Sequence, residues 1–129
     1  MTEYPPQRSS FHLFLGYWLP VLVYVTIIFA LSAQPNLRPP LQFPNSDKFF
    51  HMLEYGGLGY LLARGMRAAG RIRLALTVAL IVAVLGGAIA ASDEYFQSFI
   101  PGRESSLQDW FADFTGLLFA QIVYVFTHD

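Results

Sequence analysis

The sequence contains no cysteine among its 129 residues. This absence excludes disulfide bonds, thiolate nucleophiles and cysteine-ligated zinc, and it leaves the redox compartment open. Charge is also scarce, because charged residues make up only 13% of the chain while hydrophobic residues make up 54%. Such a composition is typical of a membrane protein rather than a soluble one. The formal net charge of −1 gives no reason to expect a nucleic acid as partner.

Four segments have the length and apolarity, or nearly so, of a transmembrane helix, which needs about 20 residues. The first is expected to be a retained span, because its apolar run is longer than that of a signal peptide. We therefore predict a single all-α domain over residues 1–129, a polytopic membrane protein built as a four-helix transmembrane bundle. The expected spans are about 13–31, 47–69, 71–97 and 107–126.

Basic residues predict the orientation of the bundle in the cell membrane. Four of the eight lie in or beside the turn between the second and third spans: Arg64, Arg67, Arg71 and Arg73. The positive-inside rule then places this turn in the cytoplasm, together with both termini. The connections between the other spans would face outward. The same arginines could bind anionic lipid head groups instead, but orientation explains them without a further assumption.

Several polar and charged residues lie inside these otherwise apolar segments. A carboxylate at the centre of a bilayer costs about 3 kcal/mol on insertion scales, so such residues are rarely idle. With this topology all of them fall at the outward ends of their helices, and small residues nearby let the helices approach closely. We therefore expect one polar site in a cavity that opens outward. It comprises Asp47, Lys48, His51, Glu54, Tyr55, Asp93, Glu94, Gln97, Arg103, Asp109 and Asp113.

Three kinds of role are expected within this site. Acid–base or other catalytic roles are assigned to His51, Glu54, Asp93 and Glu94. Substrate binding, with a guanidinium suited to a carboxylate or phosphate, is assigned to Lys48, Gln97, Arg103 and Asp109. A structural or supporting role is assigned to Asp47, Tyr55 and Asp113. Ser105 is expected to cap the last helix.

A purely structural interpretation stays open. Asp47 could serve only as a helix cap, and the Lys48 side chain could simply reach toward the membrane interface. The wider cluster could be a hydrogen-bond network that fixes helix packing. Such contacts contribute only about 0.6 to 2 kcal/mol each in membranes. This gain is small beside the cost of inserting several carboxylates, which favours a ligand-binding or catalytic role.

Two motifs in this order resemble those of the VanZ-like membrane proteins. The first is Asp47-Lys48-x-x-His51-x-x-Glu54-Tyr55-x-x-Leu58-Gly59. The second runs Asp93-Glu94-x-x-Gln97-x-x-x-Pro101-Gly102-Arg103-x-x-x-x-x-Asp109 and ends in Asp113-Phe114-Thr115-Gly116. The resemblance covers roughly residues 13–126. The family is named for a protein linked to teicoplanin resistance, so the resemblance implies a role at the cell envelope without naming a reaction.

The leading hypothesis is that the protein binds or modifies an anionic lipid or cell-envelope component, which could lower the access of lipoglycopeptides. Whether it is an enzyme stays open. One alternative is a small proton- or ion-coupled transporter, although the chain shows no inverted repeat. Another is a non-catalytic membrane partner of envelope enzymes.

No cofactor is expected. The convergent carboxylates and His51 could hold a divalent metal, but the chain has no HExxH or similarly compact metal-binding motif. The expected partners are membrane lipids and no nucleic acid. A homo-oligomer is also open, since so small a domain could complete its cavity as a dimer.

Overall fold

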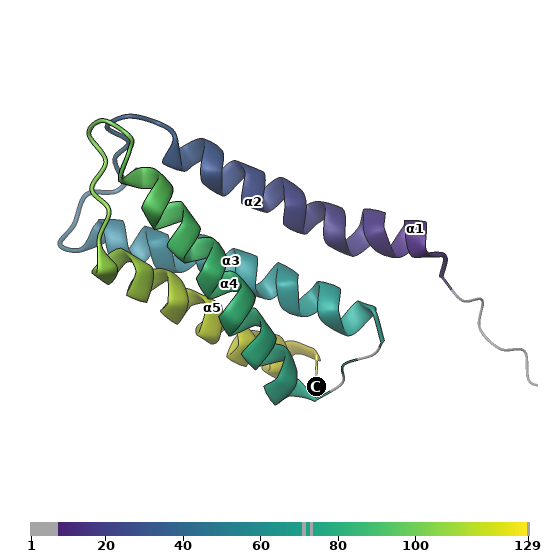
Figure 1. The fold of residues 1–129 in the computed structure, drawn as a ribbon. Coiled ribbons are helices and arrows are strands. Elements are labelled where there is room, and N and C mark those ends of the chain that lie inside the picture. Colours follow the sequence, from purple (N-terminus) through teal and green to yellow (C-terminus); the bar gives the residue numbers. More distant parts are fainter. Residues whose placement is uncertain (1–7, 71, 73, 129) are drawn as a thin grey trace, which may run out of the picture.

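The computed structural model describes residues 8–70, 72 and 74–128, and every regular element within these ranges is a helix. The first long helix combines α1 (Ser10–Leu13), the π-helical turn η1 (Phe14–Trp18) and α2 (Leu19–Ser32). The others are α3 (Ser46–Ala68), α4 (Ala75–Gln97) and α5 (Leu107–His128), as Figure 1 shows. The prediction of an all-α protein is therefore confirmed.

The observed helix bounds differ from the expected spans mainly at the start of the first span and at the start of the third span. The first helix begins earlier, where Ser9 caps it by accepting a hydrogen bond from the backbone N–H of His12. The expected start of the third span, residue 71, lies outside the described residues. Ile72 and Leu74 are not helical, so α4 begins at Ala75.

The π-helical turn ends two residues before Pro20, which has no N–H to donate to the Gly16 carbonyl four residues earlier. That carbonyl instead accepts a hydrogen bond of 3.0 Å from Arg64 Nη1 on α3. The Arg64 guanidinium also lies 4.5 Å from the centre of the Tyr17 ring. A cation near the end of α3 thus satisfies the backbone group that the proline leaves open.

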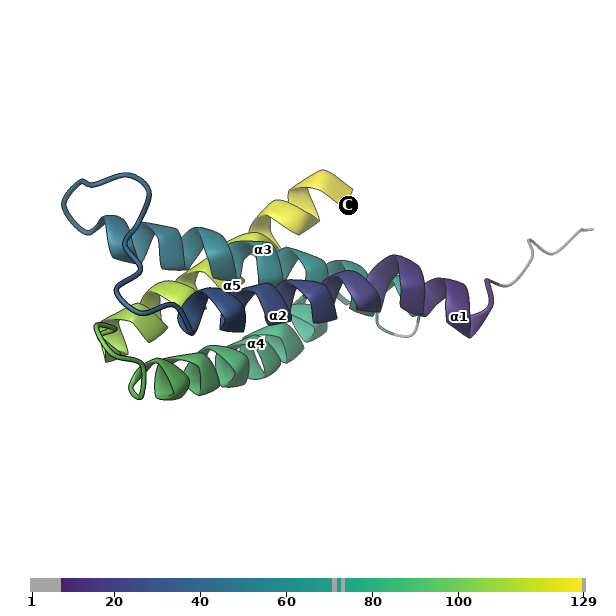
Figure 2. The ribbon, with the colours of Figure 1, turned by 90° about the horizontal axis from the view of Figure 1, so that it is seen from above.

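Helices α3, α4 and α5 pack against one another, and the α1–η1–α2 helix flanks them (Figures 1 and 2). Glycines allow the closest approaches. A Cβ added at Gly116 on α5 would meet the Met52 carbonyl and the Gly56 amide of α3. One added at Gly86 on α4 would meet the Leu117 side chain of α5. The fully buried side chains around these contacts are Tyr55, Leu58, Leu62, Val82 and Leu117.

The outer surface of the bundle is apolar over much of its length. On α4, Leu76, Leu80 and Val84 recur every four residues and are 59 to 75% exposed, so one stripe of this helix faces outward. Within the described residues, three helices are long and apolar enough to cross a membrane: Ser10–Ser32, α4 and α5. Helix α3 is as long as α4, with 23 residues, but it has more charged side chains. It is therefore less apolar than the three helices that could cross a membrane by composition alone.

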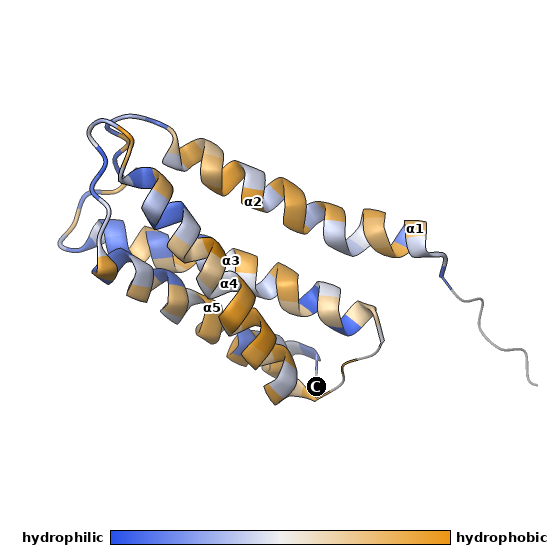
Figure 3. Ribbon diagram, viewed as in Figure 1, coloured by the Kyte–Doolittle hydropathy of each residue, from blue (hydrophilic) through white to orange (hydrophobic). Residues whose placement is uncertain are grey.

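The two connections 33–45 and 98–106 lie at the same end of the bundle, here called the loop end (Figures 1 and 2). The end of α3 and the start of α4 lie at the opposite end, as do the start of α1 and the end of α5. Figure 3 shows that hydrophilic residues gather on α3, α4 and α5 near the loop end, while the far part of α4 is hydrophobic. The hydrophilic residues of α4 therefore lie toward the loop end, where hydrophilic residues of α3 and α5 lie as well.

Substitution of Gly116 by alanine tests the close contact between α3 and α5. Although alanine favours a helix by about 1 kcal/mol, the new methyl group would overlap backbone atoms of α3, with a cost of about 1 to 3 kcal/mol. We expect Gly116→Ala to melt several degrees below the wild type in detergent. The matched control is Gly16→Ala, because nothing lies within 4 Å of a Cβ there. An equal loss in both variants would contradict this packing.

Candidate functional site

The structure brings the polar ends of three helices together at the loop end. Helices α3 and α5 begin there and α4 ends there, so residues far apart in the sequence become neighbours. Their buried polar residues at this end include four carboxylates, each at most 6% exposed: Asp93, Glu94, Asp109 and Asp113. We call these four carboxylates, together with Lys48, His51, Tyr55 and Gln97, the polar cluster.

His51 lies at the centre of the polar cluster, between α4 and α5. Its Nδ1 atom is hydrogen-bonded to Asp113 Oδ1 at 2.8 Å and lies 3.8 Å from Glu94 Oε1. The Asp113 side chain is fully buried, and that of Glu94 is 8% exposed. A buried carboxylate that contacts one imidazole nitrogen fixes the orientation of the ring. Asp113, expected to be a supporting residue, is placed where it can orient His51.

Asp93 is held by neutral donors rather than by a cation. Tyr55 Oη donates to Asp93 Oδ2 at 3.0 Å, and Gln97 Nε2 donates to the same oxygen at 3.3 Å. Gln97 Nε2 also lies 3.1 Å from Ser32 Oγ, at the end of α2. Ser32 is 3% exposed and was not among the predicted site residues. Only its place at the end of a predicted span, near the polar ends of the others, could have suggested it.

Lys48 connects the cluster to the start of α5. Its Nζ atom donates to Asp109 Oδ1 at 2.9 Å and to Asp47 Oδ2 at 2.6 Å. Asp109 is nearly buried, with its side chain 8% exposed, whereas that of Asp47 is 50% exposed. The pair with Asp109 therefore matters more for the site, because exposed ion pairs contribute little.

The cap of α5 is Ser106, not Ser105 as expected. Ser106 Oγ accepts a hydrogen bond of 3.0 Å from the backbone N–H of Asp109, the third residue of the helix. The Ser106 N–H donates to Glu94 Oε2 at 3.1 Å. Since α5 begins at Leu107, the residue immediately before it takes the cap position. The cap and a carboxylate of α4 are thereby joined.

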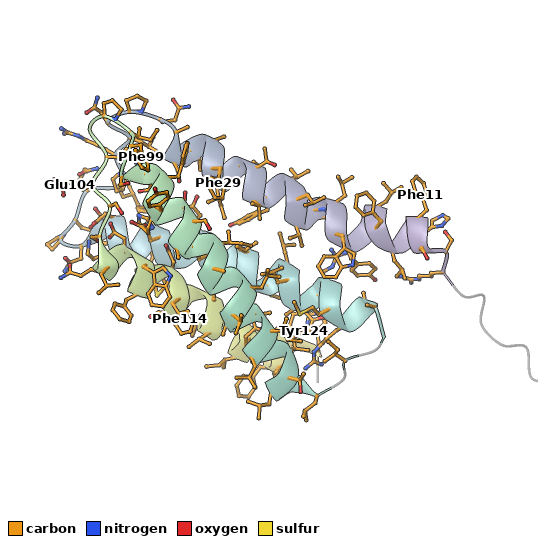
Figure 4. All side chains as sticks on the ribbon, viewed as in Figure 1. Phe11, Phe29, Phe99, Glu104, Phe114 and Tyr124 are labelled. Carbon is orange, nitrogen blue, oxygen red and sulfur yellow. The ribbon has the colours of Figure 1, made fainter. Side chains whose placement is uncertain are left out.

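A cavity of about 950 Å³ opens beside the polar cluster, between α2, α3 and the two loop-end connections. Five of the predicted site residues on α3 and α5 line it: Asp47, Lys48, His51, Glu54 and Asp109. Gln97 and Arg103 line it as well, and Arg103 Nη1 reaches the Leu37 carbonyl at 3.4 Å. Figure 4 shows the neighbouring Glu104 and Phe99 at the same end of the molecule. Asp93, Glu94, Tyr55 and Asp113 lie outside the cavity lining.

Two further cavity residues were not selected from the sequence. Arg38 lies in the proline-rich connection 33–45, which the sequence analysis treated only as a loop. Tyr24 on α2 donates to the backbone carbonyl of Glu54 at 2.8 Å and lines the same cavity. The basic charge of Arg38, on a connection expected to lie beside the site, was the available signal for it.

Three buried carboxylate oxygens have no hydrogen-bond partner among the described residues: Asp93 Oδ1, Glu94 Oε1 and Asp113 Oδ2. Burying a polar atom without a hydrogen-bond partner lowers the stability of the fold by about 1 to 3 kcal/mol, and by more when the atom is charged. One set of residues at this place could hold a metal ion. Ligand atoms of His51, Glu94 and Asp109 lie within 4.8 Å of one another.

The profile of one protein family, VanZ/LLP1, matches residues 4–128, essentially the whole chain. The protein belongs to the VanZ/LLP1 family. The resemblance seen in the two motifs is thus confirmed, and with its three apolar helices this member of the family is a membrane protein. No curated protein and no solved structure matches the chain.

Removal of the Tyr55 hydroxyl tests the polar cluster of this VanZ/LLP1 protein. Tyr55→Phe would take from Asp93 its shorter side-chain hydrogen bond, at a cost of about 1 to 3 kcal/mol. We expect a melting temperature several degrees lower in detergent. Tyr95→Phe is the matched control, because Tyr95 is 70% exposed and should be replaceable without loss. Equal melting temperatures for both variants would show that Asp93 does not depend on Tyr55.

Proposed function

We propose that this VanZ/LLP1 protein binds, in the loop-end cavity, an anionic lipid or another anionic amphiphile of the cell envelope. The cavity wall supports this proposal. Ile27 and Leu31 of α2 and Leu53 of α3 provide apolar surface, while Arg38 and Arg103 provide positive charge from the two connections. One cavity with both surfaces suits a ligand that carries an acyl chain and a phosphate or carboxylate. A guanidinium can bind either group through two parallel hydrogen bonds.

The orientation in the membrane is part of the same proposal. Helix α3, the second long helix of the chain, also spans the membrane in addition to the three apolar helices. Its polar first turns are tolerated because they face the cavity rather than lipid. Both termini lie in the cytoplasm and the loop end faces outward, as the arginines near the α3–α4 connection favour. The ligand is then a component of the outer part of the cell membrane. Binding or modifying it would lower the access of lipoglycopeptides such as teicoplanin.

Modification of the bound head group would involve Glu54 and His51, which line the cavity from successive turns of α3. A carboxylate and an imidazole that line the same cavity can act as acid and base on one ligand. Asp93 and Glu94 lie behind the cavity wall, where they contact Gln97 and His51 respectively. We therefore propose that these two carboxylates act through the cavity residues and that Lys48, Gln97, Arg103 and Asp109 contact the ligand.

Titration of the purified protein with short-chain phosphatidylglycerol tests the proposed ligand class. Loss of one charge-assisted contact costs about 1.5 to 3 kcal/mol, so Arg103→Gln should weaken binding about tenfold or more. Short-chain phosphatidylcholine, which carries no net charge, should bind at least tenfold more weakly to the wild type.

The matched control for this titration is Arg64→Gln. It removes the same charge from α3 near the opposite end of the bundle, where Arg64 contacts Gly16 and Tyr17. It should leave phosphatidylglycerol binding unchanged. Equal binding of both lipids, or equal losses in the two arginine variants, would contradict the proposed site.

Neutralisation of Glu54 distinguishes a ligand site from packing alone. The Glu54 carboxylate lines the cavity, and it has no hydrogen-bond partner among the described residues. Functional sites keep like charges close together at a cost in stability. We therefore expect Glu54→Gln to melt at the wild-type temperature or above it in detergent, with weaker or altered lipid binding. A loss of several degrees, equal to that of Tyr55→Phe, would assign Glu54 to helix packing.

A further inference from the structure

We propose that His51, Glu94 and Asp109 bind one divalent cation of the Mn²⁺ or Zn²⁺ class. Their ligand atoms, one from each of α3, α4 and α5, lie within 4.8 Å of one another. Ligand atoms about 2.1 Å from a common ion lie at most about 4.2 Å apart, so small side-chain rotations suffice to close the site. One imidazole and two carboxylates favour these metals over Ca²⁺, which prefers oxygen alone.

Charge balance is the first argument for a cation. The polar cluster contains four buried carboxylates, and among the described residues only Lys48 and, when protonated, His51 lie within ion-pairing distance of any of them. Buried negative charges without counter-charge are strongly unfavourable in a low-dielectric environment. A divalent cation between Glu94, Asp109 and the His51 ring would compensate most of this excess.

The position of Glu94 is an independent second argument. Its Oε2 atom accepts the Ser106 N–H, which holds the carboxylate in place at the start of α5. Its Oε1 atom is buried without a hydrogen-bond partner and points toward His51, 3.8 Å from Nδ1. The residue as a whole is only 6% exposed. A buried carboxylate oxygen that lacks a donor and lies beside an imidazole ring can accept a metal ion.

Asp113 supplies the supporting contact that metal-bound histidines usually have. Asp113 Oδ1 contacts Nδ1 of His51 at 2.8 Å, so the cation would take the second ring nitrogen, and Glu94 Oε1, now 3.8 Å from Nδ1, would turn toward that side of the ring. Lys48 occupies one oxygen of Asp109, Oδ1, which leaves the other oxygen for the same purpose. His51 and Asp109 both line the cavity, so an ion could enter from there and meet the phosphate of a bound ligand. With the ion bound, both ring nitrogens of His51 are occupied, so His51 would act on that ligand through the ion and Glu54 would remain as the acid–base group.

Metal content and affinity of the purified full-length protein test this site without any lipid. After treatment with a chelator and dialysis against Mn²⁺ or Zn²⁺, we expect close to one ion per chain by elemental analysis. Added Mn²⁺ should also raise the melting temperature of the chelator-treated wild type, because a ligand that binds only the folded state stabilises it. A wild type that retains less than about a tenth of an ion per chain and shows no such rise overturns the proposal.

Substitution of single ligands tests whether the ion binds at this site. Glu94→Gln and Asp109→Asn should each weaken Mn²⁺ binding at least tenfold, whereas Glu104→Gln, at a cavity carboxylate outside the three ligands, should not. Equal weakening by Glu104→Gln would overturn the assignment. If a ligand variant fails to fold, the pulsed electron paramagnetic resonance of Mn²⁺ in the wild type decides. Nitrogen coupling from one imidazole supports the site, and its absence overturns it.

The metal test and the lipid test are separable. Phosphatidylglycerol binding to the arginine variants is measured with the chelator present, and metal binding is measured without lipid. Failure of the metal site would leave the lipid proposal standing, and failure of lipid binding would leave the metal site standing.

Discussion

Buried carboxylates inside an apolar bundle must find their donors on neighbouring helices, and the rest of this structure depends on that constraint. Tyr55 on α3 donates to Asp93 on α4, and Lys48 on α3 donates to Asp109 on α5. His51 on α3 contacts Asp113 on α5. Each contact joins two helices, so together they fix the relative depth of α3, α4 and α5. A shift of one helix by a single turn, about 5.4 Å, would break all the contacts that it makes.

These short contacts require helices that approach closely, and glycines provide the room. Gly116 of α5 faces the backbone of α3 one turn below the contact between His51 and Asp113, and Gly86 of α4 receives the Leu117 side chain of α5. Larger residues at these positions would push the helices apart and lengthen the hydrogen bonds above them. The polar cluster therefore depends on the small residues. The glycines set the distance between the helices, and that distance decides whether the polar side chains can reach one another.

Helix α2 is attached to the other three long helices more loosely than they are to one another, because fewer of its residues are buried. Two of its side chains contact the other helices toward the loop end. Tyr24 donates a hydrogen bond to the Glu54 carbonyl, and Ser32 contacts Gln97. Between these two contacts and α3 lies the cavity, with an apolar wall on the α2 side and charged groups around it. In this arrangement the proposed amphiphilic ligand would bind between a closely packed three-helix core and the more loosely attached α2, away from the carboxylates buried behind the cavity wall.

The sequence by itself determined the helices, the membrane character, the family and the fact that the polar residues gather at one end. Spacing of three and four residues places Asp47, His51 and Glu54 on one face of a helix whatever it packs against. Only the tertiary structure decided which groups meet. Asp113 orients His51, Ser106 caps α5, Arg38 and Ser32 join the site, and Asp93 and Glu94 lie behind the cavity. Periodicity fixes a face of a helix, whereas its rotation, depth and distance from its neighbours are set by packing across helices.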